Sequence, residues 1–271
     1  MPISFARQLL PVGGACSWAS TGRATRDDSD VSKTRYRSSI TENVFYLIQN
    51  ANTQERRLRS LSILSGAVQA ARRVKILLIL LTVLYVGSYL VGWCLISIKS
   101  SVAVEMSQAL KEAVFTEQPF TSIIESLQGG ALVNAILVTF LVNLTMGAFL
   151  TTTLLGVVPL VGALGTIAIT LIRGFGIGVV YPEVLSASPA GFALGLGTMI
   201  LELGAYVFSG AAGINIALAP ILPRRYSVQS RWVALKMAWR DAARIYVIVV
   251  ILLALAAIWE MSGLFLVLRP S

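Results

Sequence analysis

The sequence predicts an all-α membrane protein, a polytopic bundle of about five transmembrane helices with amphipathic helices at its surface. Composition is the first reason: 56% of the 271 residues are hydrophobic and 13% are charged, whereas a soluble domain carries about 25% charged residues. The mean hydropathy of +0.76 agrees with this. The second reason is that several uncharged stretches reach the roughly 20 apolar residues that a helix needs to cross the hydrocarbon.

The first two uncharged stretches predict three spans. Residues 76–98 form the clearest one, because no charge interrupts them. Residues 126–172 are also uncharged but too long for one helix, so we expect a turn near Gly156 and Pro159. One span therefore ends before this turn and another begins after it.

The remaining apolar stretches predict a fourth and a fifth span. The stretch 191–222 is overlong for a single crossing, and we expect a bend or break near Gly213. The predicted transmembrane domain is 76–268, with spans at about 76–98, 131–154, 158–180, 191–213 and 245–268.

The basic residues predict the orientation of these spans, since cytoplasmic loops carry an excess of Lys and Arg. Residues 1–75 hold 12 basic side chains and residues 223–244 hold six, which together make 18 of the 22 in the chain. Five spans place both segments on one side, so the N-terminus is predicted to be cytoplasmic and the C-terminus extracytoplasmic. The net charge of +9 then reflects orientation in a cell membrane, and a nucleic-acid partner is not expected.

Three further segments are expected outside the bilayer core. Residues 1–38, rich in Ser, Thr, Gly, Arg and Asp, are predicted to be a flexible cytoplasmic tail. Residues 39–75 read as an amphipathic juxtamembrane segment, opened by Ser39 and Glu42 at capping-box spacing. Residues 100–128 predict an extracytoplasmic hairpin.

Residues 227–244 predict an interfacial helix with an apolar stripe and a basic face. Trp232 and Trp239 belong to the stripe, whereas Lys236, Arg240 and Arg244 belong to the basic face. One interpretation is that the tryptophans lie at headgroup depth and the cations contact anionic lipids. The other is that this helix docks a cytoplasmic partner such as an ATPase subunit.

Polar side chains within the spans are the candidate functional residues, because ionisable groups at membrane depth are costly. Arg173, Glu202 and Glu260 can form one cluster in which the arginine pairs with one or both carboxylates. Asn134 and Asn143 can hydrogen-bond to neighbouring helices. Such a cluster either locks the helices together or lines a polar path for an ion or small solute.

Small residues recur at the spacing that lets two helices approach closely. The pairs are Ser88 with Gly92, Gly174 with Gly178, Gly191 with Gly195, and Ser209 with Gly213, the last of which encloses Gly210. They predict tight packing within one bundle.

The residue composition excludes several kinds of catalytic and metal-binding site. The chain has no histidine and two cysteines, which excludes a Ser-His-Asp triad and His-containing zinc sites. We therefore expect no catalytic residue, no metal, no cofactor and no enzymatic activity.

The second half of the chain, about 70–268, resembles the stage II sporulation protein M family of membrane proteins. The resemblance rests on Asn143, on the interruption at Gly156 and Pro159, on Gly174, and on Glu202 followed by the Ser-Gly-Ala-Ala-Gly element at 209–213. Glu260 in the closing span also fits. The chain departs from the family in having Thr198-Met199 where a His-Gly pair is usual, and Arg173 where asparagine is frequent.

The resemblance implies a role as a membrane anchor, since the family's namesake anchors cell-wall-degrading proteins during engulfment in spore formers. The leading hypothesis is a non-enzymatic scaffold in the lipid bilayer that recruits protein partners. The alternative is a permease or transporter subunit with a polar path within the membrane. A homo-oligomer and an ATPase subunit are the further partners considered.

Overall fold

The computed structural model describes residues 62–268, which are almost entirely helical and contain no strand. The prediction of an all-α bundle with five membrane-spanning helices is confirmed. The helices long and apolar enough to cross a membrane are Lys75–Ser97, Leu132–Val157, Val161–Glu183, Pro189–Leu218 and Arg231–Leu266. The predicted tail at 1–38, and 39–61 of the juxtamembrane segment, lie outside the described residues.

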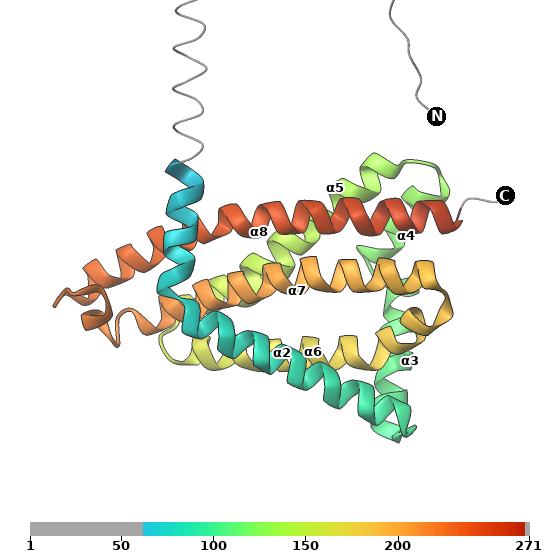
Figure 1. Cartoon of the computed structure of the whole chain (residues 1–271), viewed down its shortest axis with the longest axis horizontal. Coiled ribbons are helices and arrows are strands. Elements are labelled where there is room, and N and C mark those ends of the chain that lie inside the picture. The colour runs from blue at the N-terminus through green and yellow to red at the C-terminus, as the bar shows by residue number, and fades with distance from the viewer. Residues whose placement is uncertain (1–61, 269–271) are drawn as a thin grey trace, which may run out of the picture. The chain divides into compact units, whose positions relative to one another are not determined.

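The bundle begins with a helix at 62–73 and a turn at Val74. Figure 1 shows α6, α7 and α8 running along its length. The elements that follow Val74 are α2 (Lys75–Ser97), α3 (Ser101–Thr116), α4 (Phe120–Gln128), α5 (Leu132–Val142), η1 (Asn143–Thr153), η2 (Leu154–Val157), α6 (Val161–Ala187), α7 (Pro189–Leu218), η3 (Pro223–Tyr226) and α8 (Arg231–Leu268).

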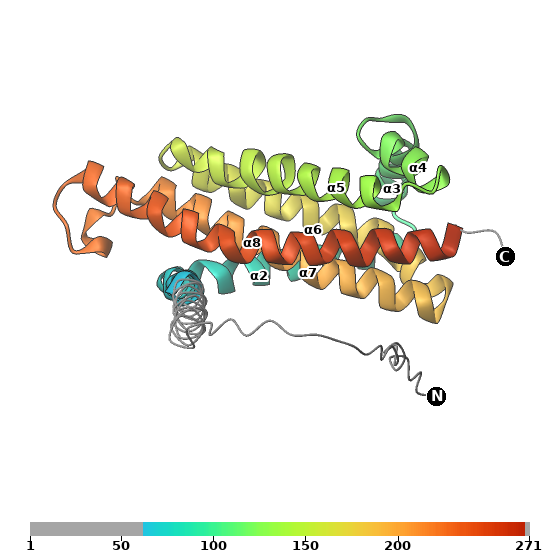
Figure 2. The same cartoon turned by 90° about the horizontal axis from the view of Figure 1, so that it is seen from above.

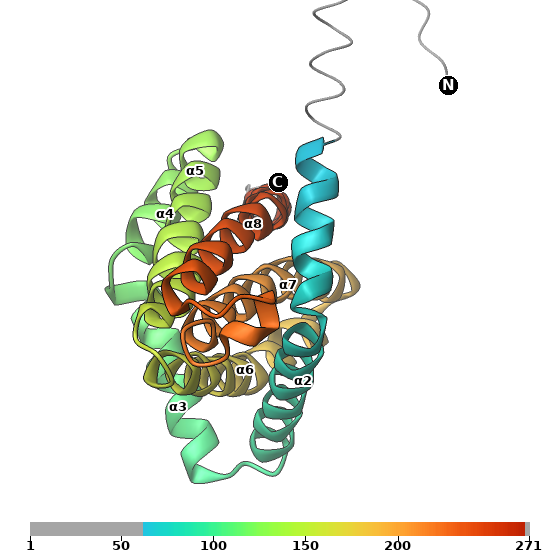
Figure 3. The same cartoon turned by 90° about the vertical axis from the view of Figure 1, so that its left-hand side faces the viewer.

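The two ends of the bundle differ in charge. Helices α3 and α4 lie beside the C-terminal end of α8, as Figures 1 and 2 show. The link between α7 and α8 lies at the opposite end, with the helix at 62–73 standing out from the bundle beside it (Figure 3). The basic residues of 62–75 and 223–244 are therefore gathered at one end, and the acidic link of α3 and α4 lies at the other.

The second span changes its helix type midway. It is α-helical from Leu132 to Val142, π-helical over η1 from Asn143 to Thr153, and 3₁₀-helical over η2 from Leu154 to Val157. A turn follows, and α6 starts at Val161. The turn expected near Gly156 and Pro159 is confirmed. A π-helix of 11 residues is uncommon, since π geometry occurs mostly as single-turn bulges.

Helices α2 and α6 cross through two of the small-residue pairs. Gly92 lies against the backbone of Gly178. A Cβ added at Gly178 would overlap the carbonyl oxygen of Tyr89, and one added at Gly174 would overlap the hydroxyl of Ser88. The pair on one helix thus packs into the pair on the other, which brings the two backbones into contact.

A second close crossing joins the end of the second span to α7. A Cβ at Gly156 would overlap the carbonyl oxygen of Gly213, and a Cβ at Gly213 would overlap that of Thr152. Helix α7 is continuous from Pro189 to Leu218, so the break considered near Gly213 is absent. This glycine makes room for a neighbouring backbone and does not interrupt its own helix.

Gly210 faces the apolar core on the same helix. A Cβ added there would stand 3.1 Å from Cδ1 of Leu81 and 3.3 Å from Cγ2 of Thr166. Leu81 is fully buried in a core that also contains Ile216 and Leu253. Gly210 is therefore a packing residue, with flexible side chains and not backbone as its nearest neighbours.

Helix α8 has 38 residues, which corresponds to a length of about 57 Å. The predicted interfacial helix and the last span are therefore one continuous element, because no residue between them ends the helix. The buried face of its first half includes Ala234, Ala238 and Ala242 together with Asp241 and Ile245. Of the predicted apolar stripe, Leu235 and Trp239 pack against the core, whereas Trp232 is 73% exposed.

The hairpin of α3 and α4 is attached to the spans at two places. Ile123 and Leu127 of α4 pack with Ala135 and Met261 in a second apolar cluster. On α3, Lys111 forms an exposed ion pair with Glu183 at the end of α6. These contacts hold the hairpin against three of the spans.

Candidate functional site

Arg173 lies on α6 in the interior of the bundle, where its guanidinium group contacts the second span and α7. Its Nη1 donates to the carbonyl oxygen of Gly147 at 2.9 Å, and its Nη2 donates to Oγ1 of Thr151 at 2.6 Å. Its Cζ also stands 4.5 Å from the ring centroid of Tyr206 on α7. The charge is thus held by hydrogen bonds and a cation–π contact, both of which are stronger where water is excluded.

The π-helical segment supplies the acceptors for this arginine. Gly147 and Thr151 both belong to η1, in which the spacing of backbone groups differs from that of an α-helix. A Cβ at Gly147 would stand 2.7 Å from the hydroxyl oxygen of Tyr206, so the glycine makes room for that ring. The backbone of η1, the guanidinium group and the tyrosine are therefore packed as one unit.

Glu202 is joined to the arginine through this tyrosine. The hydroxyl group of Tyr206 donates to Oε1 of Glu202 at 2.6 Å, one helical turn away on α7. Within residues 62–268 no ion pair links Arg173 to Glu202 or Glu260. The direct pairing considered from the sequence is replaced by a chain of contacts, because the tyrosine ring occupies the space between the two charges.

The structure does not bring all the predicted polar residues into this network. Glu260 on α8 interacts electrostatically with Glu202. Asn134 lies at the start of α5, where its Nδ2 donates to Oγ of Ser126 at 2.8 Å. Asn143 is the first residue of η1 and is partly buried. The asparagines therefore lie apart from the charged cluster.

A group of buried hydroxyls continues the network toward the basic end, and sequence reasoning missed it. Oγ1 of Thr152 donates to Oγ of Ser209 at 3.0 Å, and Oγ1 of Thr153 donates to the carbonyl oxygen of Ser209 at 3.1 Å. The hydroxyls of Thr153 and Tyr246 are 2.8 Å apart, and Thr166 donates to the carbonyl oxygen of Thr152 at 3.2 Å. These bonds join η1, α6, α7 and α8.

A pattern in the sequence does identify this polar face. Thr198, Glu202, Tyr206 and Ser209 are spaced by four, four and three residues, which places them on one side of a helix. This is the spacing of the apolar stripe on a helix of a soluble protein, but here the residues of the stripe are polar and the rest of the helix is apolar. In a membrane helix it marks the side that faces other protein segments.

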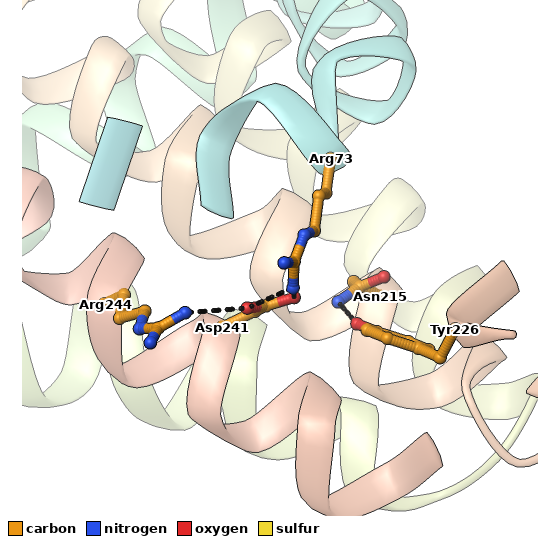
Figure 4. Close-up of polar contacts among 5 residues, drawn as sticks. All are labelled: Arg73, Asn215, Tyr226, Asp241 and Arg244. Carbon is orange, nitrogen blue, oxygen red and sulfur yellow. Dashed lines mark hydrogen bonds and ion pairs between the residues drawn. The ribbon is translucent and has the colours of Figure 1, made fainter. Parts of the chain in front are cut away.

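The basic end of the bundle holds a second polar cluster, shown in Figure 4. Asp241 is 1% exposed, and Nη1 of Arg73 stands 3.1 Å from both of its carboxylate oxygens. Nη1 of Arg244 stands 3.8 Å from Oδ1. The pair joins the helix at 62–73 to α8, and Ala67 and Ala70 of that helix are buried beside it.

The second contact in Figure 4 joins α7 to η3. Nδ2 of the buried Asn215 donates to the hydroxyl oxygen of Tyr226 at 2.6 Å. Burial raises the pKa of Tyr226, so this phenol stays protonated at neutral pH. The link between α7 and α8 is thereby fastened to the bundle.

The predicted interfacial residues take two positions on α8. Lys236 and Arg240 are exposed, whereas Trp239 is partly buried against the core. Arg244, predicted on the basic face, contributes instead to the cluster around Asp241. Exposed apolar side chains such as Trp232 and Val233 accompany the cations, a mixture typical of a membrane interface.

No group of three or more metal-ligating side chains occurs within the described part of the chain. A family model described as "Stage II sporulation protein M" matches residues 76–261. No curated protein and no solved structure matches the chain. The matched range contains both the arginine network and the acidic residue of the basic end.

Proposed function

Since the chain belongs to the stage II sporulation protein M family, we propose that it is a non-enzymatic membrane scaffold that positions partner proteins. The contacts of Arg173 carry this proposal. Arg173, a cation within the spans, joins three helices, with its nitrogens bonded to Gly147 and Thr151 and its guanidinium group against the ring of Tyr206. An arrangement of this kind makes a rigid support.

The two ends of the bundle supply the surfaces for partners. On one side, the hairpin of α3 and α4 exposes Glu105, Gln108 and Glu112. Its apolar cluster on α4 and its ion pair on α3 attach it to the spans. On the other side, the start of α8 exposes Lys236 and Arg240. A rigid bundle with opposite charge at its two ends is suited to hold one partner on each side of a membrane.

The proposed orientation puts the basic end in the cytoplasm, and cysteine accessibility tests it. In a chain whose native cysteines are replaced by serine, Gln108→Cys and Ser230→Cys introduce thiols at exposed positions on opposite ends. We expect an impermeant maleimide added to intact cells to label position 108 and to leave position 230 unlabelled until the cells are opened. Labelling of both positions from outside would contradict five crossings with the N-terminus inside.

Site-specific photocrosslinking tests the scaffold role. A photoreactive side chain at Glu105, on the exposed face of α3, is expected to give discrete protein adducts in native membranes. The same group at Val133, which is 70% exposed on α5 among the lipid-facing residues, is the matched control and is expected to give none. Equal adduct patterns at both positions would contradict a dedicated partner surface.

A permease subunit is the second candidate, favoured by the polar face formed by Thr198, Glu202, Tyr206 and Ser209. Under that alternative, the purified protein in liposomes, alone or with an ATPase subunit, moves a solute, and Glu202→Gln stops the movement while folding persists. Under the scaffold proposal, the same substitution weakens the bundle and no flux exists to be lost. A crosslinked wall-active enzyme supports the scaffold, whereas a crosslinked ATPase or solute-binding protein supports the permease.

A further inference from the structure

The charged groups in the middle of the bundle do not balance. Apart from the polar start of α8 (residues 231–244), which belongs to the basic end of the bundle, the interior of the spans holds one cation, Arg173, and two carboxylic acids, Glu202 and Glu260. With all three ionised, this region carries a net charge of minus one. An uncompensated charge at membrane depth is expensive, so it has to be compensated by a bound ion or by a proton.

The uncompensated negative charge is that of Glu260. Arg173 and Glu202 each have close partners, namely the backbone of η1 and the hydroxyl group of Tyr206. Glu260 has no ion pair and no hydrogen bond to any residue between 62 and 268, and Glu202 is the charged group that acts on it. Two like charges that influence each other in a low dielectric do not both remain ionised.

A buried hydroxyl group without a hydrogen-bond partner lies one helical turn from Glu202. Oγ1 of Thr198 is buried without a hydrogen-bond partner, and the residue is 2% exposed. Thr198 precedes Glu202 by one helical turn on the same face of α7. Nε1 of Trp259, the neighbour of Glu260 on α8, donates to the carbonyl oxygen of Leu194 at 3.1 Å, so the turn of α8 that carries Glu260 packs beside this part of α7. At 1.5 Å per residue, Thr198 lies roughly 14 Å from the outer end of α7 and Glu260 roughly 12 Å from the outer end of α8.

These three residues, Thr198, Glu202 and Glu260, define the outer acid site. We propose that the outer acid site binds one exchangeable proton, carried by Glu260 and shared electrostatically with Glu202. The proton makes the region neutral, with Glu202 balancing Arg173 through Tyr206 and with Glu260 as the neutral acid. The hydroxyl group of Thr198 can then form a hydrogen bond with the neutral carboxylic acid of Glu260, which lies at a similar depth in the membrane.

A metal cation fits the site less well than a proton. Hard cations take six or more oxygen ligands, and membrane proteins commonly supply them from carbonyl groups of unwound helices. Both α7 and α8 are continuous through this region, so their carbonyl oxygens are engaged in helical hydrogen bonds. Two carboxylates and one hydroxyl group remain, which is sufficient for a proton.

The other titratable groups around Glu260 do not alter this balance. Helix α6 carries Tyr181, whose phenol group interacts electrostatically with Glu202 and Glu260. Helix α5 and η1 carry no titratable residue, and α4 carries one, Glu125, which does not act on Glu260. The protonation of the outer acid site is therefore set by Glu202 and Arg173.

Labelling with dicyclohexylcarbodiimide tests the proposal on the full chain in lipid nanodiscs. This apolar reagent adds to a protonated carboxyl group: the acid proton goes to a carbodiimide nitrogen, the carboxyl oxygen bonds to the central carbon, and rearrangement gives a stable N-acylurea. We expect mass spectrometry to find the adduct on Glu260 at neutral pH, with labelling lost as the pH is raised. Asp241 is the internal control, since it is buried but paired with Arg73, and it is expected to stay unlabelled.

The variant Glu202→Gln separates a proton site from a merely reactive side chain. Removing the neighbouring like charge makes Glu260 easier to ionise, so we expect its labelling to fall about tenfold at the same pH, although Glu260 itself is unchanged. The variant Glu260→Gln is expected to lose the adduct, and size-exclusion chromatography of both variants checks that they are folded.

Three results would overturn the proposal. The first is wild-type protein without an adduct on either glutamate, and the second is labelling of Glu260 that is the same with and without Glu202. The third is protection by sodium ions at constant pH, which would assign the site to a cation. The crosslinking experiment that tests the scaffold role does not depend on any of these results.

Discussion

Adding one methyl group at Gly178 is expected to destabilise the bundle by about 2 kcal/mol or more. The Cβ of Gly178→Ala would overlap the carbonyl oxygen of Tyr89 on α2, and a backbone atom cannot turn away as a side chain can. The substitution therefore has to separate α2 from α6, which loses dispersion contacts along the whole crossing. The measurement is the midpoint of thermal unfolding in detergent, followed by size-exclusion chromatography.

Gly87→Ala is the matched control for this experiment. Gly87 is exposed on another face of the same helix α2, and a Cβ there would meet nothing within 4 Å. Because alanine favours a helix over glycine by about 1 kcal/mol, this control is expected to keep or raise the midpoint. Equal losses at Gly87 and Gly178 would show that the effect does not come from the contact between the two helices.

Replacing Arg73 with glutamine is expected to release the helix at 62–73 from α8. Asp241 is almost completely buried, and its remaining cation, Arg244, stands 3.8 Å away. Removing one partner of a buried ion pair costs about 3–5 kcal/mol, and we expect about 2 kcal/mol here because the side chain of Arg73 is 45% exposed and partly screened by water. Hydrogen–deuterium exchange of the amides in 62–73 measures the release, which should appear as faster exchange.

Arg72→Gln removes the same charge from the adjacent position and is the matched control. Arg72 is exposed and makes no ion pair within residues 62–268, so its replacement is expected to leave the exchange of this helix unchanged. In the double variant Arg73→Gln with Asp241→Asn, the buried charge is gone, and part of the lost protection should return. If the two arginine variants behave alike, overall charge and not the pair with Asp241 holds the helix.

The small-residue pairs could be identified from the sequence, but the helices that they contact could not. The spacing of Ser88 with Gly92 and of Gly174 with Gly178 identifies two surfaces on which a backbone can approach. Each motif describes one helix, so neither says which partner it meets. The choice of α2 against α6 depends on how five spans fit together, and a spacing within one segment carries no information about that.

The arginine network shows a similar division. The rarity of charge within the spans is enough to single out Arg173, Glu202 and Glu260. The acceptor of Arg173 is nevertheless a backbone carbonyl of Gly147, which the π-helical segment η1 presents. Nothing in the residue types around Gly147 predicts that geometry, because the choice between α and π hydrogen bonding is decided by packing against α6 and α7.

The sequence by itself determined the five helices long and apolar enough to cross a membrane, the turn near Pro159, the separation of basic from acidic segments and the membership of a family. These properties depend on each segment separately, because the free energy of moving a segment into hydrocarbon is the sum of the contributions of its own residues. Only the tertiary structure decided that Tyr206 stands between Arg173 and Glu202, that α8 continues unbroken through the predicted interfacial helix, and that Asp241 holds the helix at 62–73. Those outcomes depend on contacts between segments far apart in the chain, and such contacts are settled by the fit of the whole bundle.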